Sequence, residues 1–352
     1  MSLLVNLSFL GQKYTGITTY TKNLFPHLQS LQPTLLTSQL FPEFNCHPAP
    51  DNLTQEGGTK ANIRRLLWTQ LQLPRIYTGR KASLLFSPVP EAPLGNKTRY
   101  VVTVYDLIPL RFPKFSPLTF YSRYYLPRVL RGAEHIICIS QCTKQDLMDY
   151  FGIPGEKMSV IMLGYDRSHF IPLSLPTLPY FLYLGRYDPH KNISRLITAF
   201  SRISGDYELI LIGAFDPRFT PGLQRQVKEL GLESRVKFLD YVSYQDLPRY
   251  INQALALVYP SLWEGFGLPL LEAMACGIPV ITSNLSSLPE VVGGAGILVN
   301  PHETKEITGA MAMIGKDGEA RKHFSRLGLQ QASKFNWEVT GRQTRDLLGR
   351  YL

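Results

Sequence analysis

Two glutamates, Glu264 and Glu272, flank a Gly-Phe-Gly turn and a proline in the stretch WEGFGLPLLEAMACG. Carboxylates accept hydrogen bonds from vicinal hydroxyl groups, so a sugar or a ribose is a suitable ligand for them. Gly265 and Gly267 would let backbone N–H groups approach that ligand closely. Taken singly, Glu264 could be an exposed loop acid and Glu272 a first-turn acid that complements a helix dipole. Their combination with the glycine turn favours a binding site.

Two cations, Arg186 and Lys191, lie upstream where the apolar run PYFLYLG leads into RYDPHKN. The amphipathic stretch NISRLITAFSRI follows, and we expect a helix there with Asn192 as its N-cap. Backbone N–H groups, a helix dipole and two positive charges would then converge on one anion. A diphosphate fits this arrangement, and two solvated surface cations are the simpler alternative.

Short apolar runs alternate with amphipathic stretches from end to end, as in α/β folds whose parallel sheets are covered by helices. The pattern occurs twice, which predicts two Rossmann-like domains with ligands at the carboxyl ends of their strands. The first series of expected strands is LLVNLSFL, LLTSQLF, ASLLFS, YVVTVYD, HIICIS and SVIML; the second is YFLYLG, ELILIG, RVKFLD, LALVYP, IPVITS and GILVN.

A proline-rich segment without helical or strand period, GYDRSHFIPLSLPTLP, separates the two series. We predict an N-terminal domain over residues 1–165, an interdomain linker over 166–179, a C-terminal domain over 180–335 and a terminal segment over 336–352. The alternative for the proline-rich segment is a long surface loop inside a single domain.

The composition limits the partners and cofactors of the protein. A formal net charge of +10 and a pI near 9.3 favour an anionic partner, which could be a phosphate-bearing substrate, a membrane surface or nucleic acid. Nucleic acid is disfavoured because the basic residues are spread along the chain and no zinc-finger, RNP-like or basic-zipper signature occurs. The chain has no Asp-x-Asp and no histidine pair at metal-ligand spacing, so we expect neither a bound metal nor another cofactor.

The expected location is the cytoplasm. No apolar run reaches the ~20 residues of a membrane span, and the start lacks the basic region and cleavage site of a signal peptide. Two segments, RLLWTQLQLPRIYTGRK and RFPKFSPLTFYSRYYLPRVLRG, interleave aromatic and basic residues as a patch on an anionic membrane would. Their alternative interpretation is helix packing with solvated charges.

The stretches YLGRYDPHKNISRLITAF, DLPRYINQALALVYPSLWEGFGLPLLEAMACGIPVITSN and SSLPEVVGGAGILVNP resemble the retaining glycosyltransferases of family four. TGITTYTKNL, VVTVYDLIPLRFP and HIICISQCTKQDLMDYFGIPGEKMSVI in the N-terminal half are similar to the same family. This resemblance implies the GT-B fold, in which two Rossmann-like domains face each other across a cleft and the final helix crosses back to the first domain. It also implies a nucleotide-sugar donor and an acceptor that is a glycan or is lipid-linked.

The resemblance assigns a role to each candidate residue. Arg186 and Lys191 would bind the diphosphate, Glu264 the donor sugar and Glu272 the ribose hydroxyls. The remaining donor contacts implied by the resemblance would come from Gly16, Tyr105, Asp106, Tyr241, Val242, Gly265, Phe266, Gly267 and Leu268.

One departure from the family concerns Tyr105-Asp106, where family members commonly have His-Asp. A tyrosine keeps a hydrogen-bonding group but cannot carry the positive charge of a histidine.

The expected activity is metal-independent hexosyl transfer with retention of configuration, with a weak preference for GDP-mannose as donor. The alternative is a regulator that binds nucleotide sugars without transfer. An oxidoreductase is disfavoured because GQKYTG is not a Gly-x-Gly-x-x-Gly fingerprint.

Overall fold

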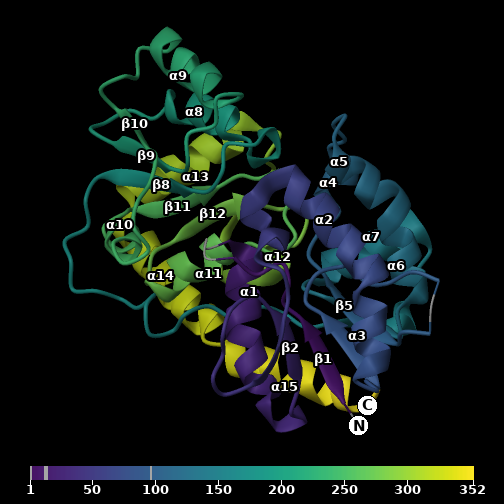
Figure 1. Ribbon diagram of the computed structural model, residues 1–352. Coiled ribbons are helices and arrows are strands. Elements are labelled where there is room, and N and C mark those ends of the chain that lie inside the picture. Colours follow the sequence, from purple (N-terminus) through teal and green to yellow (C-terminus); the bar gives the residue numbers. More distant parts are fainter. Residues whose placement is uncertain (1, 12–14, 96) are drawn as a thin grey trace. The chain divides into compact units, whose positions relative to one another are not determined.

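The computed structural model describes residues 2–11, 15–95 and 97–352 (Figure 1). The chain divides into two compact units. Unit 1 comprises Met1–Gly164 together with Trp337–Leu352, and unit 2 comprises Tyr165–Asn336. Each unit is a parallel sheet with helices packed on it, as the repeated alternation of apolar and amphipathic stretches predicts.

Unit 1 forms, within its described residues, a seven-stranded parallel sheet in the order β3-β2-β1-β4-β5-β6-β7. The edge strand β3 was not predicted, because its sequence NCHP is partly exposed and lacks an apolar pattern. It is held by the register of its ladder, in which Leu35 pairs with Cys46. The strands are β1 (Leu3–Asn6), β2 (Thr34–Thr37), β3 (Asn45–Pro48), β4 (Leu84–Ser87), β5 (Tyr100–Val104), β6 (His135–Cys138) and β7 (Met158–Val160).

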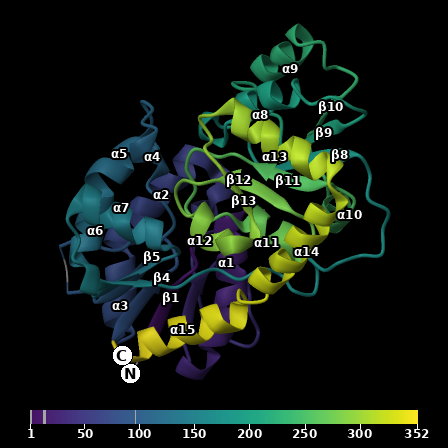
Figure 2. The ribbon, with the colours of Figure 1, turned by 180° about the vertical axis from the view of Figure 1, so that it is seen from behind.

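The last helix of the chain, α15 (Trp337–Gly349), belongs to unit 1 and packs against α1, as Figure 2 shows. The Thr340 hydroxyl donates to the carbonyl of Met162 at 2.7 Å, and the Trp337 ring lies edge-on to Tyr20 at 6.2 Å. The other α-helices of unit 1 are α1 (Gly16–Leu24), α2 (Gly58–Leu71), α3 (Leu73–Gly79), α4 (Ile108–Arg111), α5 (Pro117–Phe120), α6 (Leu126–Gly132) and α7 (Gln141–Phe151).

Unit 2 contains a parallel sheet in the order β10-β9-β8-β11-β12-β13. The strand order reverses between β8 and β11, so the loops that follow these two strands leave a topological switch point, the usual ligand position in such sheets. The strands are β8 (Tyr180–Leu184), β9 (Glu208–Ile212), β10 (Val236–Leu239), β11 (Ala256–Tyr259), β12 (Val280–Ser283) and β13 (Ile297–Val299). The helices are α8 (Ile193–Phe200), α9 (Thr220–Glu229), α10 (Leu247–Asn252), α11 (Leu268–Ala275), α12 (Leu288–Val292), α13 (Thr304–Lys316) and α14 (Gly318–Ala332).

The proline-rich segment between the two strand series is bound to unit 2. The His169 ring stacks on Tyr244 at 4.1 Å, and its Nε2 lies 2.6 Å from the Tyr244 carbonyl oxygen. Further along, the Asn252 side chain accepts from the backbone N–H of Leu173 at 2.7 Å. The segment therefore lies against α10 and is held there by specific contacts.

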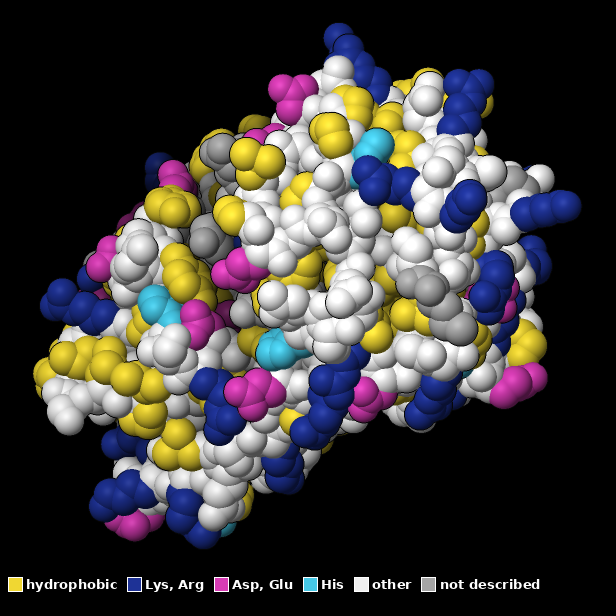
Figure 3. All heavy atoms as spheres, turned by 60° about the horizontal axis from the view of Figure 1, so that its bottom comes forward, with side chains coloured by type: hydrophobic (Ala, Val, Ile, Leu, Met, Phe, Trp, Pro, Cys, Tyr) yellow, Lys and Arg dark blue, Asp and Glu magenta, His cyan; other side chains and the backbone are white. Residues whose placement is uncertain are grey.

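Basic side chains do not gather into a single stripe on the face drawn in Figure 3; they are spread between apolar and neutral side chains. Such a distribution differs from the continuous basic stripe typical of nucleic-acid-binding surfaces. Among the helices that the structure describes, none combines the length and apolar character needed to cross a bilayer.

Candidate active site

The loop after β8 carries both predicted phosphate-binding cations. Its start is held by Tyr183, whose hydroxyl donates to the backbone carbonyl of Arg186 at 2.8 Å. Asn192 ends the loop in a left-handed conformation with φ of 63°. Asn192 occupies the predicted N-cap position of α8, but its side chain does not cap the helix; its amide donates to the carbonyls of Pro260 and Pro301 at 3.0 and 2.7 Å. The asparagine therefore joins this loop to the one after β11.

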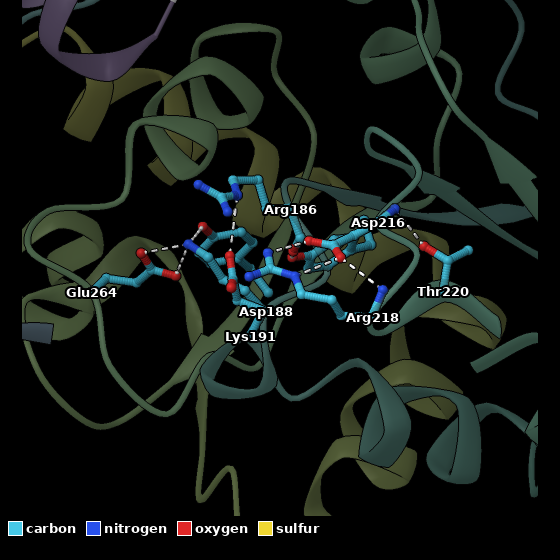
Figure 4. Close-up of polar contacts among 9 residues, drawn as sticks. Arg186, Asp188, Lys191, Asp216, Arg218, Thr220 and Glu264 are labelled. Carbon is cyan, nitrogen blue, oxygen red and sulfur yellow. Dashed lines mark hydrogen bonds and ion pairs between the residues drawn. The ribbon is translucent and has the colours of Figure 1, made fainter. Parts of the chain in front are cut away.

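Lys191 and Glu264 form the centre of the site. The Lys191 ammonium donates to both carboxylate oxygens of Glu264, at 2.7 and 2.8 Å (Figure 4). It also donates to the Tyr259 hydroxyl at 3.1 Å. Glu264 is only 7% exposed, so burial strengthens this charge pairing relative to a surface pair. The sequence predicted both residues but not their pairing, and it gave no role to Tyr259.

The Glu264 loop is held by two serines that the sequence analysis did not single out. The Ser287 hydroxyl donates to the carbonyls of Glu264 and Phe266, at 3.0 and 2.8 Å. Ser286 accepts from the backbone N–H of Glu264 at 3.1 Å. Their only signal in the sequence was the family-like stretch SSLPE, which by itself indicates no contact with the loop.

Gly267 is required by the turn between the loop and α11. Its φ is 118°, a conformation that side chains rarely adopt, and an added Cβ would lie 2.9 Å from Cδ2 of Leu288. α11 begins at Leu268 and places Glu272 on its second turn. The turn at Gly267 thus joins the loop that carries Glu264 to the helix that carries Glu272.

Glu272 occupies a different electrostatic environment from Glu264. It is partly buried by surface area, yet its carboxyl lies deep enough inside unit 2 that burial raises its pKa to about 7. No hydrogen bond or ion pair to its carboxylate is found among the described residues. A carboxylate that is desolvated and without a protein partner can accept hydrogen bonds from ligand hydroxyls.

Arg186 is more exposed than Lys191, the other predicted phosphate-binding cation. Its side chain is 72% exposed, and its Nε pairs with Oδ2 of Asp188 at 3.1 Å. Figure 4 shows Arg186, Lys191 and Glu264 at the same end of the sheet. The structure therefore brings together the predicted sugar-binding and phosphate-binding residues of unit 2.

Comparison with known proteins identifies the family. Residues 165–331 match the glycosyl transferases group 1, and residues 14–169 match glycosyltransferase family 4. O-antigen chain mannosyltransferase B of Escherichia coli is 34% identical, with 70% of this chain and 69% of that protein covered. The chain belongs to the group 1 glycosyl transferases. O-antigen chain mannosyltransferase RfbU of Salmonella typhimurium is 29% identical over 92% of this chain and 94% of its own.

Two solved structures show the same GT-B fold. Sucrose-phosphate synthase from Thermosynechococcus elongatus superimposes with a TM-score of 0.80 and 21% identity, covering 99% of both chains. Anabaena HepE, solved in complex with UDP and glucose, superimposes with a TM-score of 0.76 and 18% identity, covering 99% of this chain and all of its own. At these identities the likeness concerns the fold.

Tyr241 and Val242, which the family resemblance assigns to donor binding, follow β10 and line a groove along α10. The groove has a volume of about 380 Å³. Its lining is polar and aromatic, from Tyr241, Val242, Ser243, Asp246, Arg249, Tyr250 and Gln253.

The group 1 resemblance also assigned three residues of unit 1. Gly16 is the first residue of α1. Outside its two chain neighbours and the nearby backbone of its own helix, no described residue would have a heavy atom within 4 Å of a Cβ added there. The Tyr105 hydroxyl donates to the carbonyl of Pro88 at 2.6 Å, and burial raises its pKa well above the ordinary value. Asp106 accepts from the backbone N–H of Ile108 at 2.9 Å. Tyr105 and Asp106 thus both have partners within unit 1.

Over residues 2–11, 15–95 and 97–352, no three His, Cys, Asp or Glu side chains are grouped as a metal site requires.

Proposed function

We propose that this protein transfers a hexosyl group from a nucleoside diphosphate sugar to a hydroxyl group of a glycan or lipid-linked acceptor in polysaccharide or cell-envelope biosynthesis. The observation that carries the proposal is the buried Lys191–Glu264 pair at the switch point of unit 2, beside Arg186. It places two cations next to a carboxylate suited to sugar hydroxyls.

The proposed chemistry is retaining and independent of a metal ion. The bond between the anomeric carbon and the phosphate oxygen breaks, and its electron pair leaves with the nucleoside diphosphate. Arg186 and Lys191 stabilise the charge that develops on this leaving group. Glu264 orients the sugar, and Glu272 holds the ribose hydroxyls. The acceptor oxygen forms the new bond on the face that the phosphate leaves, and its proton departs with the phosphate.

Mannose is the first candidate for the transferred sugar. Both relatives described above are named as mannosyltransferases of O-antigen chains. GDP-mannose is therefore the preferred donor in this proposal.

A donor screen tests the proposal. The unfolding temperature should rise in the presence of one class among GDP-, UDP- and ADP-sugars. A ligand that binds only the folded state stabilises that state by mass action. The same donor should be consumed in the presence of acceptor, and NMR of the product should show the anomeric configuration of the donor. Binding without consumption under all acceptors tried would instead support the regulator, and an inverted product would refute retention.

We also propose that unit 1 contacts an anionic membrane through the aromatic segment at α5. Phe115 is 97% exposed, and its ring lies 5.5 Å from that of the exposed Phe120. Arg123 and Arg128 are exposed in the same segment, so apolar and basic groups occur together, as interfacial binding requires. The other segment with aromatic and basic residues differs, because its Trp68 is buried in the core.

Liposome flotation tests this contact. Vesicles with anionic lipid should bind the protein, and vesicles of neutral lipid should bind it less. Replacing Phe115 and Phe120 by serine should reduce binding severalfold. Leu40→Ser is the matched control, because Leu40 is 89% exposed outside this segment. Failure of the unaltered protein to float with anionic vesicles would refute the contact.

A further inference from the structure

A third cation approaches the phosphate-binding loop from the neighbouring strand. The loop after β9 carries Asp216 and Arg218. The Arg218 guanidinium donates two hydrogen bonds to the Asp216 carboxylate, from Nε to Oδ1 at 2.9 Å and from Nη2 to Oδ2 at 2.5 Å. The backbone N–H of Arg218 also donates to the Asp216 carboxylate, at 2.9 Å. Thr220 accepts from the backbone N–H of Asp216 at 2.9 Å. The backbone N–H groups of Phe219 and Thr220 also donate to the Asp216 carbonyl oxygen, at 3.0 and 2.8 Å, so the turn is held by its own hydrogen bonds.

The loops after β8 and β9 meet backbone to backbone. A Cβ on Gly213, just after β9, would overlap the carbonyl oxygen of Gly185, just after β8. Only a glycine permits this approach. The contact fixes the start of the Arg218 loop against the start of the Arg186 loop.

The charges of the two loops interact across this contact. The hydrogen bond to Asp216 raises the pKa of Arg218, and the charge of Asp188 on the other loop adds a smaller effect in the same direction. The hydrogen bond from Arg218 lowers the pKa of Asp216, and the charge of Arg186 adds a smaller effect in the same direction. Figure 4 shows the four side chains side by side at the end of the sheet that also holds Lys191.

Each of the three cations is paired with a carboxylate. Arg186 pairs with Asp188, Lys191 with Glu264 and Arg218 with Asp216. The side chain of Arg218 nevertheless remains 59% exposed. An arginine has five N–H donors, so two bonds to Asp216 leave others for a second anion.

We infer that Arg218 is a third donor-binding cation, which contacts the diphosphate of the nucleotide sugar together with Arg186. The inference rests on the proposed function, since it takes the diphosphate to lie over the Arg186 loop. Asp216 orients the guanidinium in the unliganded protein and competes with the phosphate for it.

Nucleotide binding by single-site variants tests the inference. The probes are GDP, UDP and ADP with the corresponding monophosphates, measured by calorimetry on the full chain. Arg218→Ala should weaken binding of the preferred diphosphate by about tenfold or more, as for loss of a charge-assisted hydrogen bond. Binding of the monophosphate should change less. Arg218→Lys keeps the positive charge but lacks the planar guanidinium with its paired N–H donors. Its affinity for the diphosphate should therefore lie between those of Arg218→Ala and the unaltered protein.

The variant Asp216→Asn distinguishes a ligand-binding arginine from one that only pairs with its own loop. If Arg218 binds the diphosphate, removing the competing charge of Asp216 should raise the affinity, whereas Arg218→Ala should lower it. If Arg218 only stabilises the turn, Arg218→Ala and Asp216→Asn should lower the unfolding temperature together and leave affinity unaltered, and the inference would be wrong.

Two further comparisons complete the design. Arg225→Ala is the matched control, because Arg225 is an exposed arginine on α9, the helix that follows the Arg218 loop. Arg186→Ala reports on the proposed function. Weakened binding in Arg186→Ala with normal binding in Arg218→Ala would overturn only the inference. Absence of binding of any diphosphate to the unaltered protein would overturn both.

Discussion

Replacing Lys191 by alanine should lower the rate of sugar transfer by a factor of about 100 or more, the effect of losing one preorganised donor to a developing oxyanion. Donor consumption at saturating acceptor measures this rate. Lys191 is the buried cation of the site, with its ammonium within 2.7 to 3.1 Å of Glu264 and Tyr259. Arg186→Ala should cause a loss of similar size. Near-normal transfer by either variant would refute the phosphate assignment.

The two cations should differ in their effect on stability. Without Lys191 the Glu264 carboxylate is buried and unpaired, so the free energy of unfolding should fall by about 3 kcal/mol. Arg186 is 72% exposed, so its removal should change that free energy by less than about 1 kcal/mol.

The double variant Lys191→Ala with Glu264→Gln separates stability from chemistry. It removes the unpaired charge, so it should regain most of the lost stability while transfer remains slow. Tyr259→Phe is a milder control, because it removes one acceptor of Lys191 and keeps the ring that stacks on Tyr183 at 5.8 Å. We expect it to slow transfer only severalfold. If the double variant regained normal transfer, Lys191 would be structural rather than a ligand of the donor.

Replacing Glu272 by glutamine should stabilise the unliganded protein above neutral pH and weaken nucleotide binding. Burial raises the carboxyl pKa from 4.5 to about 7. Below pH 4.5 the carboxyl is protonated in both the folded and the unfolded chain and has no effect on stability. As pH rises through the window up to 7, the unfolded chain loses its proton first, so the folded state becomes progressively less favoured.

The expected gain for Glu272→Gln is therefore near zero at pH 4 and on the order of 1 to 3 kcal/mol at pH 8. Denaturant unfolding at the two pH values measures it. Glu229→Gln, on the exposed end of α9, is the matched control and should show no such trend. An equal effect of Glu272→Gln at both pH values would contradict a buried carboxyl with a raised pKa.

The same variant tests the ribose assignment. Hydroxyl groups of the ligand donate to the ionised carboxylate, so nucleotide affinity should rise between pH 6 and pH 8 in the unaltered protein. Glu272→Gln should weaken nucleotide binding by about tenfold to a hundredfold and abolish this rise. Unchanged affinity in the variant would mean that Glu272 does not touch the nucleotide.

The sequence predicted most of the fold, because parallel strands buried on both faces appear as short apolar runs such as YFLYLG and LALVYP. It failed at β3, whose residues are partly exposed and whose pairing depends on a neighbour distant in the sequence. It located Asn192 at the N-cap position of α8 but could not show that its side chain binds the carbonyls of two prolines distant in the sequence.

The sequence by itself determined which residue types stand at the carboxyl ends of the strands of unit 2: two glutamates, an arginine, a lysine and the glycines between them. Local periodicity and turn chemistry suffice for that, since each depends on near neighbours along the chain. Only the tertiary structure decided that Lys191 is paired with Glu264 and that burial raises the pKa of Glu272, whose carboxylate has no hydrogen bond or ion pair among the described residues. It also decided that the loop carrying Arg218 packs against the loop carrying Arg186, through the contact of Gly213 with Gly185. Charge pairing and desolvation depend on strand order and on distances across the fold, and neither is encoded in spacing along the chain.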